Sequence, residues 1–251
     1  LILAGMWGLV DPPRAEAVAS IEKAHQAGIR VAMLTGDHAS TAQAIGTKVG
    51  ISQPQDRVLT GQAIETMEEG EFRARVLDTD VFARVSPAHK LRIMQALQEK
   101  GEIVAMTGDG VNDAPALKSA SIGIAMGRTG TEVAREAADM ILTDDNFATI
   151  VAAVEEGRVI FNNLRRVVFF LLTTNIGEVL TLVTALVLGL PLPVTAVMIL
   201  WINLLTDGVS TIPLGIEPKH RDVLEGPPRS PEEGLLDKST IRRIVLLAPV
   251  M

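Results

Sequence analysis

The chain contains no cysteine, so disulfide bonds and thiolate metal sites are excluded. It also lacks an excess of basic residues: its formal net charge is −7, which argues against a general nucleic-acid binder. It begins at Leu1 with neither an initiator methionine nor a signal peptide, and it ends at Met251 inside an apolar run that starts near Ile244. These features predict a fragment of a longer protein.

Apolar residues are unevenly distributed along the chain. Their overall share of 47% is ordinary for a soluble protein. Residues 167–188, however, are almost uncharged, and residues 192–216 are nearly so. Each stretch is long enough to cross a bilayer core, which needs roughly 20 residues. The sequence therefore predicts a soluble half up to about Ile150 and a membrane half after it.

Short apolar runs alternate with helical patterns in the soluble half. The expected strands are residues 1–10, 30–34, 81–84, 103–106 and 122–125. The expected helices are residues 15–27, 39–49 and 87–100, with a short one near Asp113. Residues 52–79 are polar and are expected to be irregular. Such alternation predicts a parallel sheet with helices on both faces and ligands at the carboxyl ends of its strands.

The triplet Thr-Gly-Asp closes two of these strands, at residues 35–37 and 107–109. Glycine lets the backbone approach an anion closely, and carboxylates such as Asp109 and Asp113 are hard ligands suited to Mg²⁺. Lys90 is placed to offset charge on a phosphoryl group. The alternative is structural, since such a triplet is usually a turn and Asp113 can cap a helix. Two triplets with Lys90 between them favour a site for phosphate and Mg²⁺.

A single helix is expected from residue 147 to 188. At about 1.5 Å per residue it exceeds the bilayer thickness, so it is predicted to project from the membrane as a stalk. Arg158, Arg165 and Arg166 lie at the entry and favour a cytoplasmic start. Residues 189–193 form the expected turn, and a second helix returns toward the cytoplasm.

Polar residues interrupt both apolar stretches. A charge at the centre of a membrane helix costs about 2.5–3.5 kcal/mol on insertion scales, so it usually signals function. Spacings of three and four place these residues on one face of each helix. Their oxygens suit a hard cation such as Ca²⁺; they are Asn175, Glu178, Asn203, Thr206 and Asp207.

Two further features of these stretches allow other interpretations. Gly208 and Pro213 are expected to loosen the second helix and to free carbonyl oxygens as additional ligands. Asparagine and threonine can also simply join neighbouring helices, which is the interpretation favoured for Thr173 and Thr181.

Several motifs resemble those of the P-type ATPases, a family in the haloacid-dehalogenase superfamily. Residues 107–115, TGDGVNDAP, resemble the hinge motif of that family, and residues 11–14 and 33–37 resemble two more of its motifs in the right order. The resemblance continues through residues 144–147. In the membrane half, residues 175–178 and 203–208 look like the fifth- and sixth-helix motifs of the type IIA pumps, the sarco/endoplasmic-reticulum calcium pumps, and residues 227–231 look like the next cytoplasmic loop.

The resemblance implies a role for each matching residue. Asp109 would hold Mg²⁺, and Asp113 would complete the carboxylate cluster. Lys90 would neutralise charge in the transition state, and Thr35 with Gly36 would contact the phosphoryl group. The implied catalytic set is Thr35, Gly36, Asp37, Lys90, Asp109 and Asp113. The implied set for nucleotide or phosphate is Thr35, Gly36, Asp37, Arg84, Lys90 and Asn112.

The chain departs from the family pattern by an absence. It contains no Asp-Lys-Thr-Gly nucleophile motif, no nucleotide-binding domain and no actuator Thr-Gly-Glu, all of which are expected upstream of Leu1. The chain alone is therefore predicted to be inactive. Its expected partners are those upstream domains, membrane lipid and a transported cation.

The predicted fold is a haloacid-dehalogenase-like α/β sheet followed by a helical transmembrane hairpin with a cytoplasmic stalk, in a multi-pass membrane protein. The expected division is residues 1–146, the C-terminal part of a cytoplasmic phosphorylation domain; 147–188, stalk and first span; 189–216, turn and second span; 217–240, a cytoplasmic loop; and 241–251, the start of a further span.

Four functions are compatible with this organisation. The first is transport of Ca²⁺ driven by ATP through an aspartyl-phosphate, with Mg²⁺ as cofactor. The second is a pump of the same class for Na⁺, K⁺ or Mn²⁺. The third is a membrane-anchored phosphatase-like domain without transport, against which Glu178 and Asp207 argue, because an anchor has no need of them. The fourth is a non-catalytic regulatory or truncated product.

Overall fold

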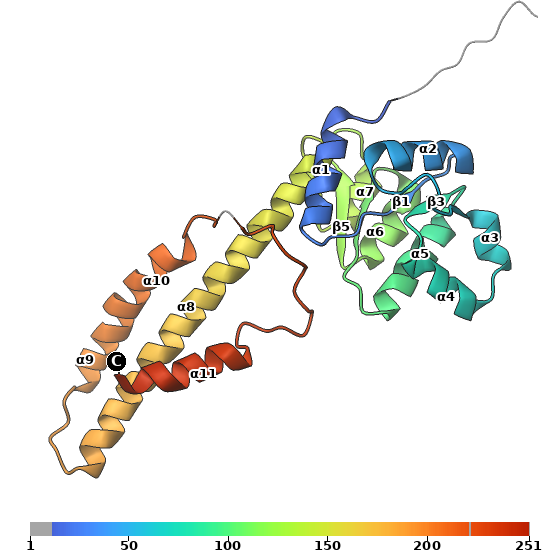
Figure 1. The fold of residues 1–251 in the computed structure, drawn as a ribbon. Helices are drawn as coiled ribbons and strands as arrows, with labels where there is room; N and C mark the ends of the chain where they lie inside the picture. Colours follow the sequence, from blue (N-terminus) through green and yellow to red (C-terminus); the bar gives the residue numbers. More distant parts are fainter. Residues whose placement is uncertain (1–11, 221, 251) are drawn as a thin grey trace, which may run out of the picture. The chain divides into compact units, whose positions relative to one another are not determined.

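A computed structural model describes residues 12–220 and 222–250, which form two compact units, Leu1–Ala152 and Ala153–Met251. Figure 1 follows the chain through both. The strand expected over residues 1–10, and Asp11 of the motif at residues 11–14, lie outside the described residues.

The described strands of the first unit form two three-stranded parallel sheets, which confirms the predicted parallel α/β architecture. The first sheet has the order β1-β3-β2, with bounds Met33–Leu34, Val81–Ala83 and Leu59–Thr60. The second has the order β4-β5-β6, with bounds Ala105–Gly108, Ile122–Met126 and Met140–Leu142. The division arises because β1 and β4 each pair with a described strand along one edge only. The two Thr-Gly-Asp triplets stand at the carboxyl ends of these two edge strands.

Helices cover both faces of the first sheet. Successive strand residues point to opposite faces. Val81 and Ala83 accordingly pack with Ala42 of α2, whereas Phe82 packs on the other face with residues of α4 and α5. The helices of this half are α1 (Ala15–Gln26), α2 (Ala39–Val49), α3 (Gly61–Thr66), α4 (Glu69–Leu77) and α5 (Pro87–Glu99).

Local signals explain where two of these helices begin and end. The helix α2 ends at Gly50, whose φ of 85° lies in the left-handed region that glycine adopts without strain. The helix α5 begins after Ser86, which exchanges side-chain and backbone hydrogen bonds with His89 in a capping box, and Pro87 stands at its first position.

Residues 52–79 are not irregular, contrary to the sequence-based expectation. They contain β2, α3 and α4, and their side chains Ile64, Phe72 and Val76 are fully or almost fully buried. Phe72 and Val76 are four residues apart, which puts both on the inner face of an otherwise polar helix. Tertiary burial of a few apolar side chains thus outweighs the polar composition of the segment.

The second sheet is also covered on both faces. Met106 and Ala125 pack against α6 (Ala114–Ser119) and α7 (Glu132–Ala137), and Ile124 and Leu142 pack against the beginning of α8. A 3₁₀ turn, η1 (Val111–Asp113), leads into α6. The helix α7 and the strand β6 were not anticipated from the sequence.

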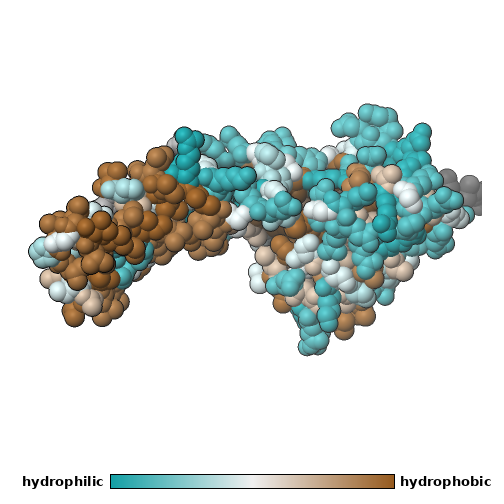
Figure 2. All heavy atoms as spheres, turned by 90° about the horizontal axis from the view of Figure 1, so that it is seen from below, coloured by the Kyte–Doolittle hydropathy of each residue, from teal (hydrophilic) through white to brown (hydrophobic). Residues whose placement is uncertain are grey.

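The second unit is built on α8 (Phe147–Val187), an unbroken helix of 41 residues that begins within the first unit. After the turn at Gly189, whose φ is 66°, the chain returns through α9 (Ala196–Trp201), the π-helix η2 (Ile202–Asp207) and α10 (Gly208–Gly215). Among the described residues, α8 and the helix Ala196–Gly215 are long and apolar enough to cross a membrane, judged by length and composition. Figure 2 shows that the visible surface of this hairpin is mostly hydrophobic, whereas that of the first unit is mostly hydrophilic.

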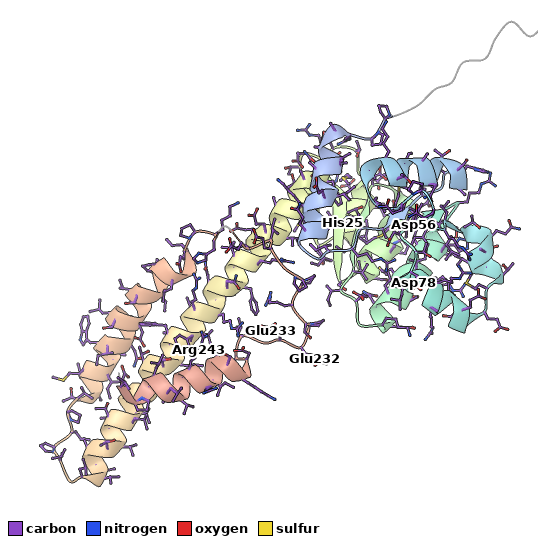
Figure 3. The ribbon with its side chains drawn as sticks, in the orientation of Figure 1. His25, Asp56, Asp78, Glu232, Glu233 and Arg243 are labelled. Atoms are coloured by element: carbon purple, nitrogen blue, oxygen red, sulfur yellow. The ribbon has the colours of Figure 1, made fainter. Side chains whose placement is uncertain are left out.

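Ion pairs fasten the segment after α10 to α8. Arg165 contacts Glu233 at 3.2 Å and also pairs with Asp237, and Lys219 contacts Glu155 at 2.9 Å. Glu233 is labelled in the loop before α11 in Figure 3. The helix α11 (Lys238–Leu247) begins before the apolar run that was expected to start near Ile244.

Candidate functional site

The first Thr-Gly-Asp triplet forms a turn that is tied to the end of β3. The Thr35 hydroxyl accepts a hydrogen bond from the Asp37 N–H at 3.1 Å. The Thr35 and Asp37 carbonyls accept bonds from the N–H groups of Val85 and Arg84, at 3.1 and 3.0 Å. Gly36 and the side chains of Asp37 and Arg84 are exposed. The turn therefore presents its polar groups to solvent at the carboxyl end of the sheet.

Glycine in the second triplet is required by close packing. A Cβ atom added to Gly108 would lie 2.5 Å from the Cβ of Asp113, a distance that no side chain tolerates. Asp113 is only 6% exposed, and its Oδ2 accepts a bond from the Gly110 N–H at 3.3 Å. The residues after β4 are therefore folded tightly around the Asp113 carboxylate.

Lys90 and Asp113 form an ion pair between the part of the first unit around the first sheet and the part around the second sheet. The Lys90 Nζ lies 2.7 Å from the Asp113 Oδ1. Lys90 belongs to α5, which follows the first sheet, and Asp113 follows β4 of the second sheet. Lys90 was expected to face a phosphoryl group and Asp113 to join a carboxylate cluster; here each neutralises the other.

Asp109 is a carboxylate of this region that stays exposed, as does Asp37. Its side chain is exposed and receives no hydrogen bond from the described residues, and Asn112 beside it is also exposed. No group of three or more His, Asp or Glu side chains able to hold a metal occurs among residues 12–220 and 222–250. Mg²⁺ often takes only one or two protein carboxylates and completes its shell with water and phosphate oxygens. A single open carboxylate therefore fits that ion.

The hairpin contains a second polar cluster, centred on Asp207. This residue is 2% exposed, and its Oδ2 accepts bonds from the Thr174 hydroxyl at 3.0 Å and from the Asn175 amide at 3.4 Å. Among the described residues, neither its buried Oδ1 nor the buried Oε1 of Glu178 has a hydrogen-bond partner. Thr174 and Glu178 are four residues apart on one face of α8, the face that Asp207 contacts. Two unsatisfied carboxylate oxygens thus belong to the same helix–helix contact.

The remaining predicted ligands are less closely gathered. Asn203 donates to the Ile199 carbonyl of its own helix at 3.1 Å, and Thr206 is exposed. Both lie in the π-helix that ends at Asp207, immediately before Gly208. Such widened turns frequently occur at functional sites. Thr174, which sequence reasoning did not select, has a detectable signal, because it lies four residues before Glu178.

Comparison with known proteins agrees with this division into two parts. Residues 3–121 match the family of haloacid dehalogenase-like hydrolases, and residues 191–251 match the C-terminal region of cation-transporting ATPases. The chain therefore carries a haloacid dehalogenase-like domain followed by a segment that matches the C-terminal region of cation-transporting ATPases.

Relatives cover almost the whole chain. Identity is 51% over 99% of it to the cation-transporting ATPase pma1 of Synechocystis sp., and 46% over 98% to a calcium-transporting ATPase of Bacillus subtilis. It is 46% over the full chain to the calcium-transporting ATPase type 2C member 2 of Mus musculus. The chain spans 27–28% of the length of these relatives. It is therefore similar, over nearly its whole length, to one part of the cation-transporting ATPases.

Proposed function

We propose that the full-length protein carrying this chain is an ATP-driven cation pump that works through an aspartyl-phosphate, with Ca²⁺ as its transported ion. The observation that carries the proposal is the pair of buried, unpartnered oxygens on Glu178 and Asp207. A carboxylate buried without a counter-charge is costly, so these groups require a cation or protons. Two relatives are named calcium-transporting ATPases, which supports Ca²⁺ as the transported ion.

The cation site proposed for the hairpin uses oxygen ligands throughout. Glu178 and Asp207 supply negative charge, and Asn175, Asn203 and Thr206 supply amide and hydroxyl oxygens. Ca²⁺ accepts six to eight such ligands in flexible geometry, whereas Mg²⁺ demands a near-ideal octahedron. The π-helix contributes to this role, because its widened turn alters which carbonyl oxygens the helix itself uses.

The first unit supplies the proposed phosphoryl-transfer groups. Mg²⁺ would be held by Asp109 and would supply positive charge next to the phosphoryl oxygens. Thr35 and Gly36 would contact the phosphoryl group. Lys90 would stand beside it, oriented by its ion pair with Asp113. The surrounding residues proposed to hold nucleotide or phosphate are Asp37, Arg84 and Asn112.

The membrane arrangement follows from the same proposal. The helix α8 and the helix Ala196–Gly215 would be two spans of a multi-pass protein. Arg165 and Arg166 would lie on the cytoplasmic side, where basic residues accumulate, together with the phosphorylation domain. At about 1.5 Å per residue, α8 is about 60 Å long and extends well beyond a single bilayer core.

The test is the level of acid-stable phosphoenzyme that the full-length protein forms from ATP at increasing free Ca²⁺. We expect micromolar Ca²⁺ to activate phosphorylation. Activation by Na⁺, K⁺ or Mn²⁺ instead of Ca²⁺ would change the assigned ion, but the assignment as a cation pump would stand. Phosphorylation that depends on no cation other than Mg²⁺ would favour a membrane-anchored phosphatase-like domain.

A further inference from the structure

Asp145 is an acidic residue of the first unit that the proposed reaction does not use. It is 7% exposed and has a φ of 54°, in the left-handed region. Its Oδ1 accepts bonds from the N–H groups of Gly127 and Arg128 at 2.7 and 3.0 Å. Its Oδ2 accepts bonds from the N–H and the hydroxyl of Thr129 at 2.8 and 2.9 Å. These bonds hold the pKa of Asp145 at about 2, so it stays ionised.

The segment that Asp145 binds is the loop between β5 and α7, which Figure 1 shows leaving the second sheet. Close packing fixes its path: a Cβ atom on Gly127 would lie 2.6 Å from the Leu142 carbonyl oxygen, and one on Gly130 would lie 1.9 Å from the Met126 carbonyl oxygen. The Arg135 guanidinium also donates to the Gly127 carbonyl at 3.0 Å. The loop therefore has little freedom while the carboxylate is in place.

The C-terminal end of this loop is hydrogen-bonded to the backbone of Asp109, the residue proposed to hold Mg²⁺. The Thr131 N–H donates to the Asp109 carbonyl at 2.8 Å. On the other side, Arg14 donates to the Asp145 carbonyl at 2.7 Å. Arg14, Asp145, the loop and Asp109 thus form one continuous chain of hydrogen bonds. Outer partners of this kind set the orientation of metal-binding carboxylates.

We infer that Asp145 is a positioning residue for Asp109: its carboxylate fixes the loop of residues 127–131 and thereby sets how Asp109 meets Mg²⁺. The inference rests on the proposed function, because it assumes that Asp109 holds the ion. Asp145 itself touches neither metal nor substrate.

Asp145→Asn in the full-length protein is the main test. Asparagine tolerates the left-handed conformation, so the change removes the anion without adding backbone strain. The adjacent Asp144 gives a matched control: it accepts bonds from Asn146 and Thr149, and among the described residues it lies near the Arg128 charge but accepts no hydrogen bond from the loop. Phosphoenzyme formed from inorganic phosphate is measured against free Mg²⁺, and hydrogen exchange of residues 127–131 is measured without ligands.

We expect Asp145→Asn to raise the half-saturating Mg²⁺ concentration about tenfold, in line with outer-partner mutations elsewhere, with a near-normal phosphoenzyme level at saturation. Loop amides should exchange faster, and Asp144→Asn should change neither quantity. A lower maximum with unchanged half-saturation would reveal a purely structural role and overturn the inference, as would an equal shift in Asp144→Asn.

Thr129→Val keeps the experiment decisive if Asp145→Asn does not fold. It removes only the hydroxyl bond to Asp145 Oδ2 and should raise the half-saturating Mg²⁺ two- to threefold, a part of the effect expected for the whole carboxylate. An unchanged value would contradict the inference. Failure of the proposed phosphoryl transfer looks different, since the unaltered protein would then form no phosphoenzyme at all, and the inference about Asp145 would fail with it.

Discussion

Two buried acids of the first unit differ from two acids of the membrane hairpin in how completely their oxygens are satisfied. In the first unit Asp113 faces Lys90 at 2.7 Å, and Asp145 accepts bonds from the loop that follows β5. In the hairpin Asp207 and Glu178 each keep a buried oxygen without a hydrogen-bond partner among the described residues. The two acids of the first unit are thus satisfied by groups of the chain itself. Under the proposed function, the two acids of the hairpin are satisfied by a cation or by protons.

Under the proposed function, this difference is the one between structural acids and acids that bind a transported ion. A permanent partner lowers the energy of a buried carboxylate but also occupies it. A transport site has to release its ion, so it cannot contain a fixed cation of its own. Asp109 is intermediate: it is exposed and unpaired, as expected for a carboxylate that meets a metal only when substrate is bound.

The largest expected effect concerns Asp109. In the full-length protein Asp109→Ala should abolish phosphoenzyme formation from ATP and from inorganic phosphate, because the proposed Mg²⁺ ligand is removed. Labelled ATP and labelled phosphate with acid quenching measure both reactions. Binding of the transported cation should survive, and near-normal phosphorylation in the variant would rule out the metal role.

The hairpin acids should give a more selective loss. Glu178→Gln and Asp207→Asn should each raise the Ca²⁺ concentration needed to activate phosphorylation by at least about tenfold, the equivalent of about 1.4 kcal/mol. Phosphorylation from inorganic phosphate should remain possible. Thr181→Val is the control, since the Thr181 hydroxyl bonds the Gly177 carbonyl of its own helix. If all three variants raised the activating Ca²⁺ concentration equally, Glu178 and Asp207 could not be distinguished from a structural side chain such as Thr181.

The ion pair of the first unit should respond as a structural contact. Lys90→Met leaves the buried Asp113 carboxylate unpaired and should lower the local free energy of unfolding by about 1–3 kcal/mol. Hydrogen exchange of α5 amides in the full-length protein measures it. Adding Asp113→Asn should restore part of the loss. If the double variant loses the sum of the two single effects, the two side chains do not stabilise each other.

The smallest effect is a pH dependence at Asp145. Its pKa is about 2 in the folded protein and about 3.9 in an unfolded chain. A lowered pKa stabilises the fold above the unfolded value, and this contribution disappears as the pH falls through about 2. The stability difference between the unaltered protein and Asp145→Asn should therefore be constant from pH 5 to 7 and shrink below pH 4. Acid unfolding followed by circular dichroism tests this; a difference that grows in acid would contradict it.

Much of the fold was accessible from the sequence because its signals are local. Helix α2 with Gly50, helix α5 with Ser86 and Pro87, and the long helix α8 follow from capping residues and periodicity. The segment 52–79 was misjudged, since Phe72 and Val76 give only a weak pattern among charged neighbours. Among the described strands, β1 and β4 each pair along one edge only, and such pairing between distant segments cannot be derived from local sequence signals.

The sequence indicated which residues make up the candidate sites, but not which of their side chains contact one another. The sequence singled out the two Thr-Gly-Asp triplets and the acids of the hairpin as polar groups in unusual places, and their roles stay predictions. The pairing of side chains was not predicted, since Lys90 with Asp113 and Thr174 with Asp207 join residues 23 and 33 positions apart. The π-helix before Gly208 was likewise beyond prediction, because it depends on backbone geometry and not on residue type.

Equilibrium binding of labelled Ca²⁺ to the full-length protein, without ATP, tests the central claim most directly. We predict saturable binding at micromolar Ca²⁺ that is lost in Asp207→Asn and retained in Asp109→Ala. Binding of equal strength in Asp207→Asn and in the unaltered protein would contradict the claim that the unpartnered carboxylates of the hairpin hold the transported ion.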